Sequence, residues 1–156
     1  MKEKLGKALA AGLYGKGTHA ESLKIVDGIS DDQAKERITE HVHSSWEQLF
    51  HIVFWQDLCL KAARLEKVDW PKDGEPSWPA ELTTDTWDDL VARFKSGLEE
   101  AKTLSLESDL AAPMASWADF PVLSSLIVLA QHNSYHLGQI VVNRLTQGTW
   151  PMPKEE

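Results

Sequence analysis

Two histidines that a metal ion could bind stand one helical turn apart in residues 131–139, which read QHNSYHLGQ. On an α-helix His132 and His136 lie about 40° apart, so both imidazoles leave the same face. The residues around them are mostly Leu, Ile, Val and Ala, which predicts a helix that is apolar nearly all round and therefore central. Neutral imidazole is a common ligand of divalent transition metals. The pair is therefore a candidate source of two metal ligands inside the protein.

Three further polar residues, Ser125, Gln139 and Asn143, fall on the same stripe of that helix. Buried polar groups are costly unless they are hydrogen-bonded, so a line of them indicates a shared task. We expect Tyr135, Gln139 and Asn143 to orient ligands of the site or to form a hydrogen bond with an imidazole. The sequence identifies no catalytic side chain among them.

The third candidate ligand is His51, which lies in a second apolar segment with Trp55 and Leu58 on its helical face. One histidine there and two on a facing helix would present three imidazoles in the core of a helical bundle, where such proteins build metal sites. Three protein ligands leave a position for water or substrate, as in catalytic zinc sites. The residues therefore predict a metal site made of His51, His132 and His136.

Other interpretations of the histidines stay open. A fourth ligand, His43 or Glu47, would make the site closed and structural. Alternatively, all the histidines are core residues and no metal binds. His19 is expected to have a structural role in a capping turn. His41 and His43 precede a helix, as loop residues or as a rival metal-binding pair, and Cys59 is expected to be a core thiol.

Two metalloprotein classes are disfavoured by what these segments lack. No Glu follows His132, so the His-Glu-x-x-His motif of zinc proteases is absent. Residues 121–148 contain no carboxylate, and the Glu-x-x-His spacing that di-iron bundles repeat on two helices occurs once, in residues 40–43. The sequence therefore argues against a zinc protease and against a ferritin-like oxidase.

The composition limits the classes of binding partner and the cellular compartment that we expect for this protein. The chain of 156 residues has a formal net charge of −8 and scattered Lys and Arg, so no nucleic-acid partner is expected. No segment is long enough to span a membrane, and Gly6 and Lys7 interrupt any signal-peptide pattern in residues 1–12. The single cysteine makes the fold independent of an oxidising compartment. We expect a soluble cytoplasmic protein that acts on a small-molecule substrate.

Helix-start signals mark the elements that must hold the three histidines. Capping-box patterns occur at residues 18–21, 30–33 and 44–47. Apolar spacing predicts long helices over about residues 45–66, 85–106 and 121–148. Residues 68–79 hold three prolines and two tryptophans, so a long loop packed onto the protein is expected between the second and third main helices. Residues 1–156 are predicted to form a single all-α domain, most simply a four-helix bundle.

Three segments resemble one known family. Residues 132–144, HNSYHLGQIVVNR, are similar to the signature of its last helix. Residues 43–60, HSSWEQLFHIVFWQDLCL, are similar to its second helix, and residues 17–30, GTHAESLKIVDGIS, to its first-helix region. The family is the DinB-like superfamily, also called YfiT-like or damage-inducible, of metal-binding four-helix-bundle proteins.

The resemblance implies that His51, His132 and His136 are the metal triad, with water completing the coordination of zinc or nickel. It also implies an activity found among such proteins: transferases or isomerases that use bacillithiol, mycothiol or related small thiols. Homodimers are frequent in the family. Because no clear general base is present, with Glu47 assigned to a capping box, a thiol S-transferase fits the residues better than a hydrolase. The alternatives are a metal-dependent hydrolase, a non-catalytic metal-binding stress-response protein, or a dimerising helical protein.

Overall fold

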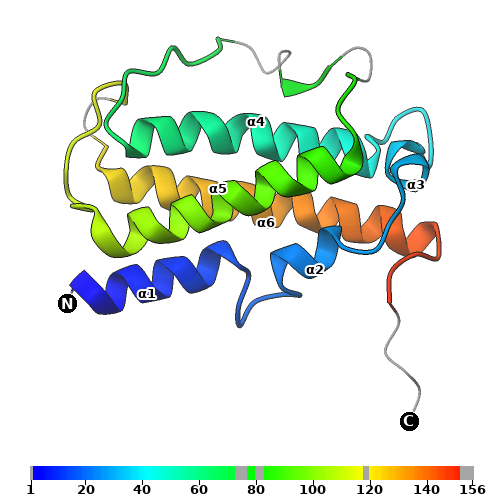
Figure 1. Cartoon of the computed structure of the whole chain (residues 1–156), viewed down its shortest axis with the longest axis horizontal. Coiled ribbons are helices and arrows are strands. Elements are labelled where there is room, and N and C mark those ends of the chain that lie inside the picture. The colour runs from blue at the N-terminus through cyan, green and yellow to red at the C-terminus, as the bar shows by residue number, and fades with distance from the viewer. Residues whose placement is uncertain (1, 73–76, 80–82, 118–119, 152–156) are drawn as a thin grey trace.

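The computed structural model describes residues 2–72, 77–79, 83–117 and 120–151, and within them the regular structure is helical. Six helices follow one another in this part of the chain: α1 (Lys2–Leu13), α2 (Ser22–Val26), α3 (Asp31–Lys35), α4 (Ser45–Ala63), α5 (Trp87–Glu107) and α6 (Val122–Thr146). The longer helices α1, α4, α5 and α6 lie alongside one another, and the short α2 and α3 connect α1 to α4 (Figure 1). The predicted all-α class and four-helix arrangement are confirmed.

Helices α4 and α6 form the central pair of the bundle, with the most extensive helix–helix contact in the described chain. Leu49 and Ile52 of α4 and Leu129 and Ile140 of α6 are fully buried and belong to one hydrophobic core. Side chains that leave the facing surfaces of these two helices are therefore removed from water. No helix among the described residues is both long and apolar enough to cross a membrane.

The start of α4 is fixed by the capping box that the sequence predicts. The Glu47 amide donates to Ser44 Oγ at 3.2 Å, and the Ser44 amide donates to Glu47 Oε2 at 2.7 Å. This cap sets the register of His51 two turns into the helix. The helix ends at Ala63, slightly before the predicted end, because Leu65 takes a left-handed φ of 64°.

The prediction for the beginning of the chain was wrong. The first long helix is α1, whereas residues 17–30, expected as the first-helix region, contain only the short α2. Thr18 does not cap a helix: its hydroxyl donates to the Gly15 carbonyl at 3.0 Å, inside a turn where Gly15 and Gly17 have φ of 73° and 83°. Glycine permits that turn and so ends α1. In α1 itself, Gly6 allows close approach to α5, since an added Cβ would overlap the Ser105 carbonyl oxygen.

Residues 64–86, here called the crossover loop, lie between α4 and α5 in the chain, and some of their described residues contact the rest of the protein. Trp70 Nε1 donates to the Ser116 carbonyl at 2.8 Å, and its ring lies against Trp117 with 5.4 Å between centroids. Within this loop, residues 73–76 and 80–82 lie outside the described residues. Ser77 and Trp78, between those two stretches, reach the candidate site.

Candidate metal centre

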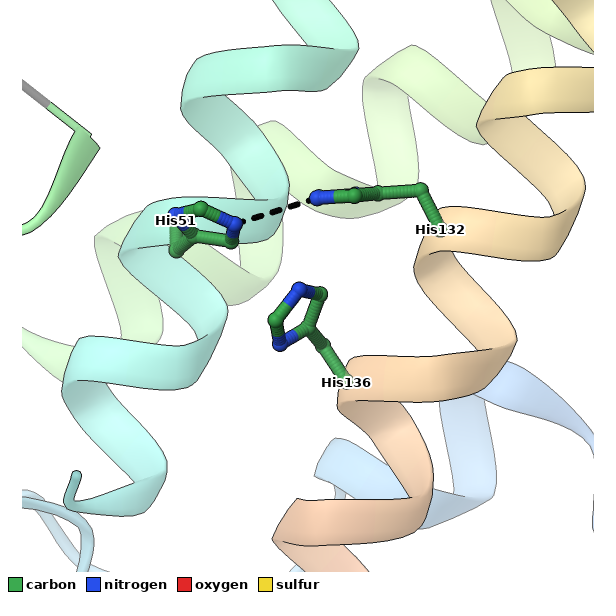
Figure 2. Close-up of side chains that lie close together, drawn as sticks. All are labelled: His51, His132 and His136. Atoms are coloured by element: carbon green, nitrogen blue, oxygen red, sulfur yellow. Dashed lines mark hydrogen bonds between the residues drawn. The ribbon is translucent and has the colours of Figure 1, made fainter. Parts of the chain in front are cut away.

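The three predicted histidines converge between α4 and α6. His51 leaves α4, while His132 and His136 leave α6 one turn apart, and the three rings face one another across the gap (Figure 2). One nitrogen of each ring can be chosen so that the three atoms lie within 4.8 Å of one another. In the described part of the chain, no other group of three or more His, Cys, Asp or Glu side chains is arranged to hold a metal ion.

The spacing of the nitrogens fits a shared cation. His51 Nε2 lies 3.1 Å from His132 Nε2. In a tetrahedral zinc site with Zn–N distances of about 2.0–2.1 Å, two ligand nitrogens lie roughly 3.3 Å apart. A donor set of three imidazoles without a carboxylate suits borderline-soft divalent ions such as zinc, nickel or copper. The residues present therefore fit a divalent transition metal.

The three imidazoles are held in the neutral form that binds metals. Burial lowers the pKa of His51 to about 3, and the nearby His136 and His132 rings reinforce the effect because a charge on one ring would repel a charge on the next. Burial also lowers the pKa of His136 to about 4, with His132 adding to it, and it lowers the pKa of His132. At neutral pH each ring therefore keeps a nitrogen lone pair.

The orientation of His136 is fixed by Gln48, a residue of α4 that is buried with it. His136 Nδ1 lies 2.7 Å from Gln48 Oε1, and because an amide oxygen can only accept, Nδ1 carries the proton. Nε2 is then the atom with the free lone pair. Gln48 Nε2 in turn donates to Gln139 Oε1 at 2.6 Å. Gln139 therefore contacts Gln48 and not an imidazole, and its orienting role stays a prediction.

Gln48 was not identified from the sequence, although a signal was available. It lies three residues before His51 and therefore on the same side of α4. An uncharged amide on an apolar face gave no reason to single it out. In metal sites, a histidine ligand usually donates a hydrogen bond from the ring nitrogen that does not bind the metal. Gln48 accepts such a bond from His136.

The other two histidines have weaker polar support. Nδ1 of His51 and Nδ1 of His132 are buried, and neither reaches full hydrogen-bond geometry with a described neighbour. The Ser77 backbone lies beside His51 and the Asn133 side chain beside His132, and each favours the protonated form of its histidine. Packing against other rings must therefore contribute to holding these two imidazoles in place.

Tryptophans from two different elements surround the histidines. The Trp78 indole is stacked on His51, with 3.9 Å between centroids and 14° between planes, and meets His136 edge-on at 5.7 Å. Trp55 meets His51 and His132 edge-on, at 6.3 and 6.4 Å. Trp55 was predicted on the face of His51. The contact of Trp78 with the histidines was missed, because a loop residue has no helical period that could indicate its partner.

The remaining polar residues of the α6 stripe mostly join α6 to other segments. Ser125 Oγ donates to the Cys59 carbonyl at 2.9 Å, and Asn143 Nδ2 donates to the His43 carbonyl at 3.0 Å. Both residues face α4 or its start, as the helical wheel predicts, but neither orients an imidazole. Tyr135 is 68% exposed and touches His136 through its ring, with 4.9 Å between centroids.

The histidines outside the triad have other surroundings. His19 bridges Ala20 and Ser134, with Nδ1 at 2.7 Å from the Ala20 carbonyl and Nε2 at 3.0 Å from Ser134 Oγ. These contacts join the turn after α1 to α6, but the helix cap in which His19 was predicted to lie does not form. His41 is exposed beside Glu40. Neither His41 nor His43 belongs to the converging group.

Glu47 is occupied by partners of its own. Its carboxylate forms an ion pair with Arg37 and accepts the Ser44 amide of the capping box. Burial raises the pKa of Glu47, but the hydrogen bonds from Arg37 and Ser44 outweigh burial and lower it overall. Glu47 is therefore an ionised structural group whose oxygens are already hydrogen-bonded.

Cys59 is a buried free thiol. Burial raises the pKa of this thiol to about 11, which agrees with the prediction that Cys59 is a core residue.

Comparison with known proteins gives one match. A sequence model of the DinB superfamily matches residues 16–140, which include all three converging histidines. No curated protein and no solved structure matches the chain. The matched segment covers most of the 156 residues and runs from the turn after α1 into α6. The chain belongs to the DinB superfamily.

Proposed function

We propose that this protein binds one divalent metal ion, zinc or nickel, through His51, His132 and His136, and uses it to activate a small thiol for transfer to an electrophile. The observation that carries the proposal is the convergence of three neutral imidazoles from two helices within 4.8 Å. Three protein ligands leave room in the coordination sphere for an exogenous group. A cytoplasmic location is proposed with it, since the one cysteine, Cys59, is a buried free thiol.

The charge balance of the site favours an anionic ligand. Neutral imidazoles would leave the double positive charge of the cation uncompensated, and that charge would lower the pKa of a thiol or water molecule placed beside it. Gln48 keeps His136 in the required tautomer. Trp55 and Trp78 shield the rings from water, which strengthens electrostatic interactions inside the site.

The proposal that a thiol and not water is the nucleophile rests on Glu47, the carboxylate nearest to His51 in the sequence. Hydrolysis gains from a general base that takes a proton from water, and Glu47 is engaged by Arg37 and Ser44. A thiol releases its proton to solvent near neutral pH once its pKa is lowered, and the thiolate is then the nucleophile. In the transfer its sulfur forms a bond to the electrophilic carbon, whose leaving group departs with the bonding electron pair.

The experiment is a conjugation assay on one protein in two states. Protein reconstituted with zinc or nickel and protein treated with a chelator are each given a small thiol and a chromogenic aromatic electrophile. We expect faster conjugation with the metal-loaded protein, and loss of that excess rate in His132→Ala. Ester hydrolysis that exceeds thiol conjugation would favour the hydrolase instead. Metal binding without either activity would favour the non-catalytic protein.

The outer side of α6 supports a second proposal, that two copies of this chain form a dimer. Four partly exposed apolar side chains stand along it: Val128, Tyr135, Val142 and Leu145. Gly138 lies on the same side, and a Cβ added there would meet nothing within 4 Å. A two-fold axis would set this face against the same face of a second copy and bury both.

Light scattering tests the dimer. The wild-type protein should have twice the mass of one chain, and Val142→Glu should have the mass of one chain. Leu5→Glu, which changes an exposed residue of α1, should remain dimeric.

A further inference from the structure

The indole of Trp78 is stacked on two imidazoles, those of His43 and His51. Both centroid separations are 3.9 Å, and the planes differ by 13° and 14°. Two imidazoles at that separation would overlap if they shared one face of the indole, so they occupy opposite faces. The crossover loop thus inserts one side chain between the residue that precedes the α4 cap and a predicted metal ligand.

This stack adds to the polar support of His51, which comes from the backbone of Ser77. His136 is oriented by a hydrogen bond from its Nδ1 to Gln48 Oε1, whereas Nδ1 of His51 has no such side-chain acceptor among the described residues, and the backbone of Ser77 lies beside its ring. A metal ligand must be held in plane and direction if its lone pair is to meet the cation. The plane of the His51 ring is set by the parallel indole.

We propose that Trp78 is a positioning residue of the metal centre, which holds the His51 imidazole in its metal-binding orientation; this inference rests on the proposed metal binding. His43 supports the indole from its other face. It is anchored in turn by Asn143 Nδ2, which donates to its carbonyl at 3.0 Å, and by the Glu47 carboxylate, 3.4 Å from its Nδ1. Because the indole separates His43 from His51, His43 acts as a support and not as a fourth ligand.

Trp78 variants test this role through zinc affinity, measured by competition with a chromophoric chelator. Trp78→Leu removes the stack and should weaken zinc binding about tenfold, the lower end of the loss seen when groups behind a ligand are removed. Trp78→Phe keeps an aromatic face and should restore most of the affinity. Trp70→Leu is the matched control, because Trp70 lies in the same loop but packs on Trp117, and its zinc affinity should equal that of the wild type.

His43 variants separate stacking from ligation. Phenylalanine can stack but cannot bind a metal, so His43→Phe should keep the wild-type zinc affinity, and His43→Leu should weaken it less than Trp78→Leu does. The visible absorption of Co²⁺-loaded protein should change in Trp78→Leu and not in Trp78→Phe. These His43 variants also decide the matter if Trp78→Leu fails to fold.

The outcomes distinguish the two proposals. If the wild type does not bind zinc, nickel or cobalt, the proposed function fails. If the wild type binds and Trp78→Leu binds equally well with an unchanged Co²⁺ spectrum, Trp78 has no positioning role. If His43→Phe loses as much affinity as His132→Ala, His43 is a ligand and the stacking account is overturned.

Discussion

Gln48 Oε1 accepts a hydrogen bond from His136 Nδ1 at 2.7 Å across the contact between α4 and α6. The bond leaves Nε2 of His136 as the nitrogen with a free lone pair. It also links the two helices that carry the three histidines, so that the helix packing and the tautomer of a predicted ligand depend on the same side chain. Gln139 completes the arrangement by accepting from Gln48 Nε2 at 2.6 Å.

Replacing Gln48 should therefore weaken metal binding without removing a ligand. Gln48→Leu deletes the acceptor and leaves the buried Nδ1–H of His136 unpaired, so we expect zinc affinity to fall about 10–100-fold. Gln48→Glu is the matched control, since it keeps an acceptor oxygen at the same position and should retain tight binding. Chelator competition on both variants measures the difference. Equal affinities for Gln48→Leu and the wild type would show that the bond does not orient His136.

The lowered pKa values predict how the metal-free protein responds to acid. His51 and His136 titrate at about 3 and about 4 in the folded chain, whereas an unfolded histidine titrates near 6.5. At a pH between the folded and unfolded pKa values, the unfolded state binds more protons than the folded state. The two histidines therefore leave the free energy of unfolding unchanged well above pH 6.5, and they lower it as the pH falls below 6.5. We expect a loss of about 1 kcal/mol or more per pH unit between pH 6 and 4.5.

Urea denaturation in the presence of a chelator, at several pH values, measures this slope. His136→Gln removes one of the two groups and should show a shallower dependence over the same interval. A wild-type profile that stays flat from pH 7 to pH 4.5 would mean that the three imidazoles are not buried together as described.

Glu47 is expected to matter for stability and not for metal content. Glu47→Gln keeps a side chain that can complete the capping box but loses the charge that pairs with Arg37. Hydrogen bonds to charged groups contribute about 1.5–3 kcal/mol, so the free energy of unfolding should fall by an amount in that range. Elemental analysis of the same variant should give the wild-type metal content. A variant that loses its metal would identify Glu47 as a ligand.

The three histidines could be chosen from the sequence because helical periodicity decides which residues share a face. His132 and His136 needed only their spacing, and His51 needed only the apolar face around it. Gln48 lies on that same face, but an uncharged amide carries no signal of its own until its partner on α6 is known. Trp78 could not be assigned at all, because its contact with His51 depends on the path of a loop across the bundle.

The fold class could also be predicted, but not every element. The cap at Ser44 and Glu47 is a local interaction between residues three apart, so it is visible in the sequence. Helix α1 is different, because Gly6 weakens its helical pattern while serving a close approach to Ser105 of α5. A contact between residues so far apart in the chain leaves no trace in local spacing, and the first helix was therefore placed too late.

Metal content tests the central claim most directly. The native protein, dialysed against zinc or nickel and then against buffer, should retain about one divalent ion per chain by elemental analysis. His132→Ala should retain none, whereas His41→Ala, which alters an exposed histidine outside the triad, should retain the wild-type amount. A wild-type protein without metal after this treatment, or a His132→Ala variant that keeps a full equivalent, would contradict the three-histidine centre.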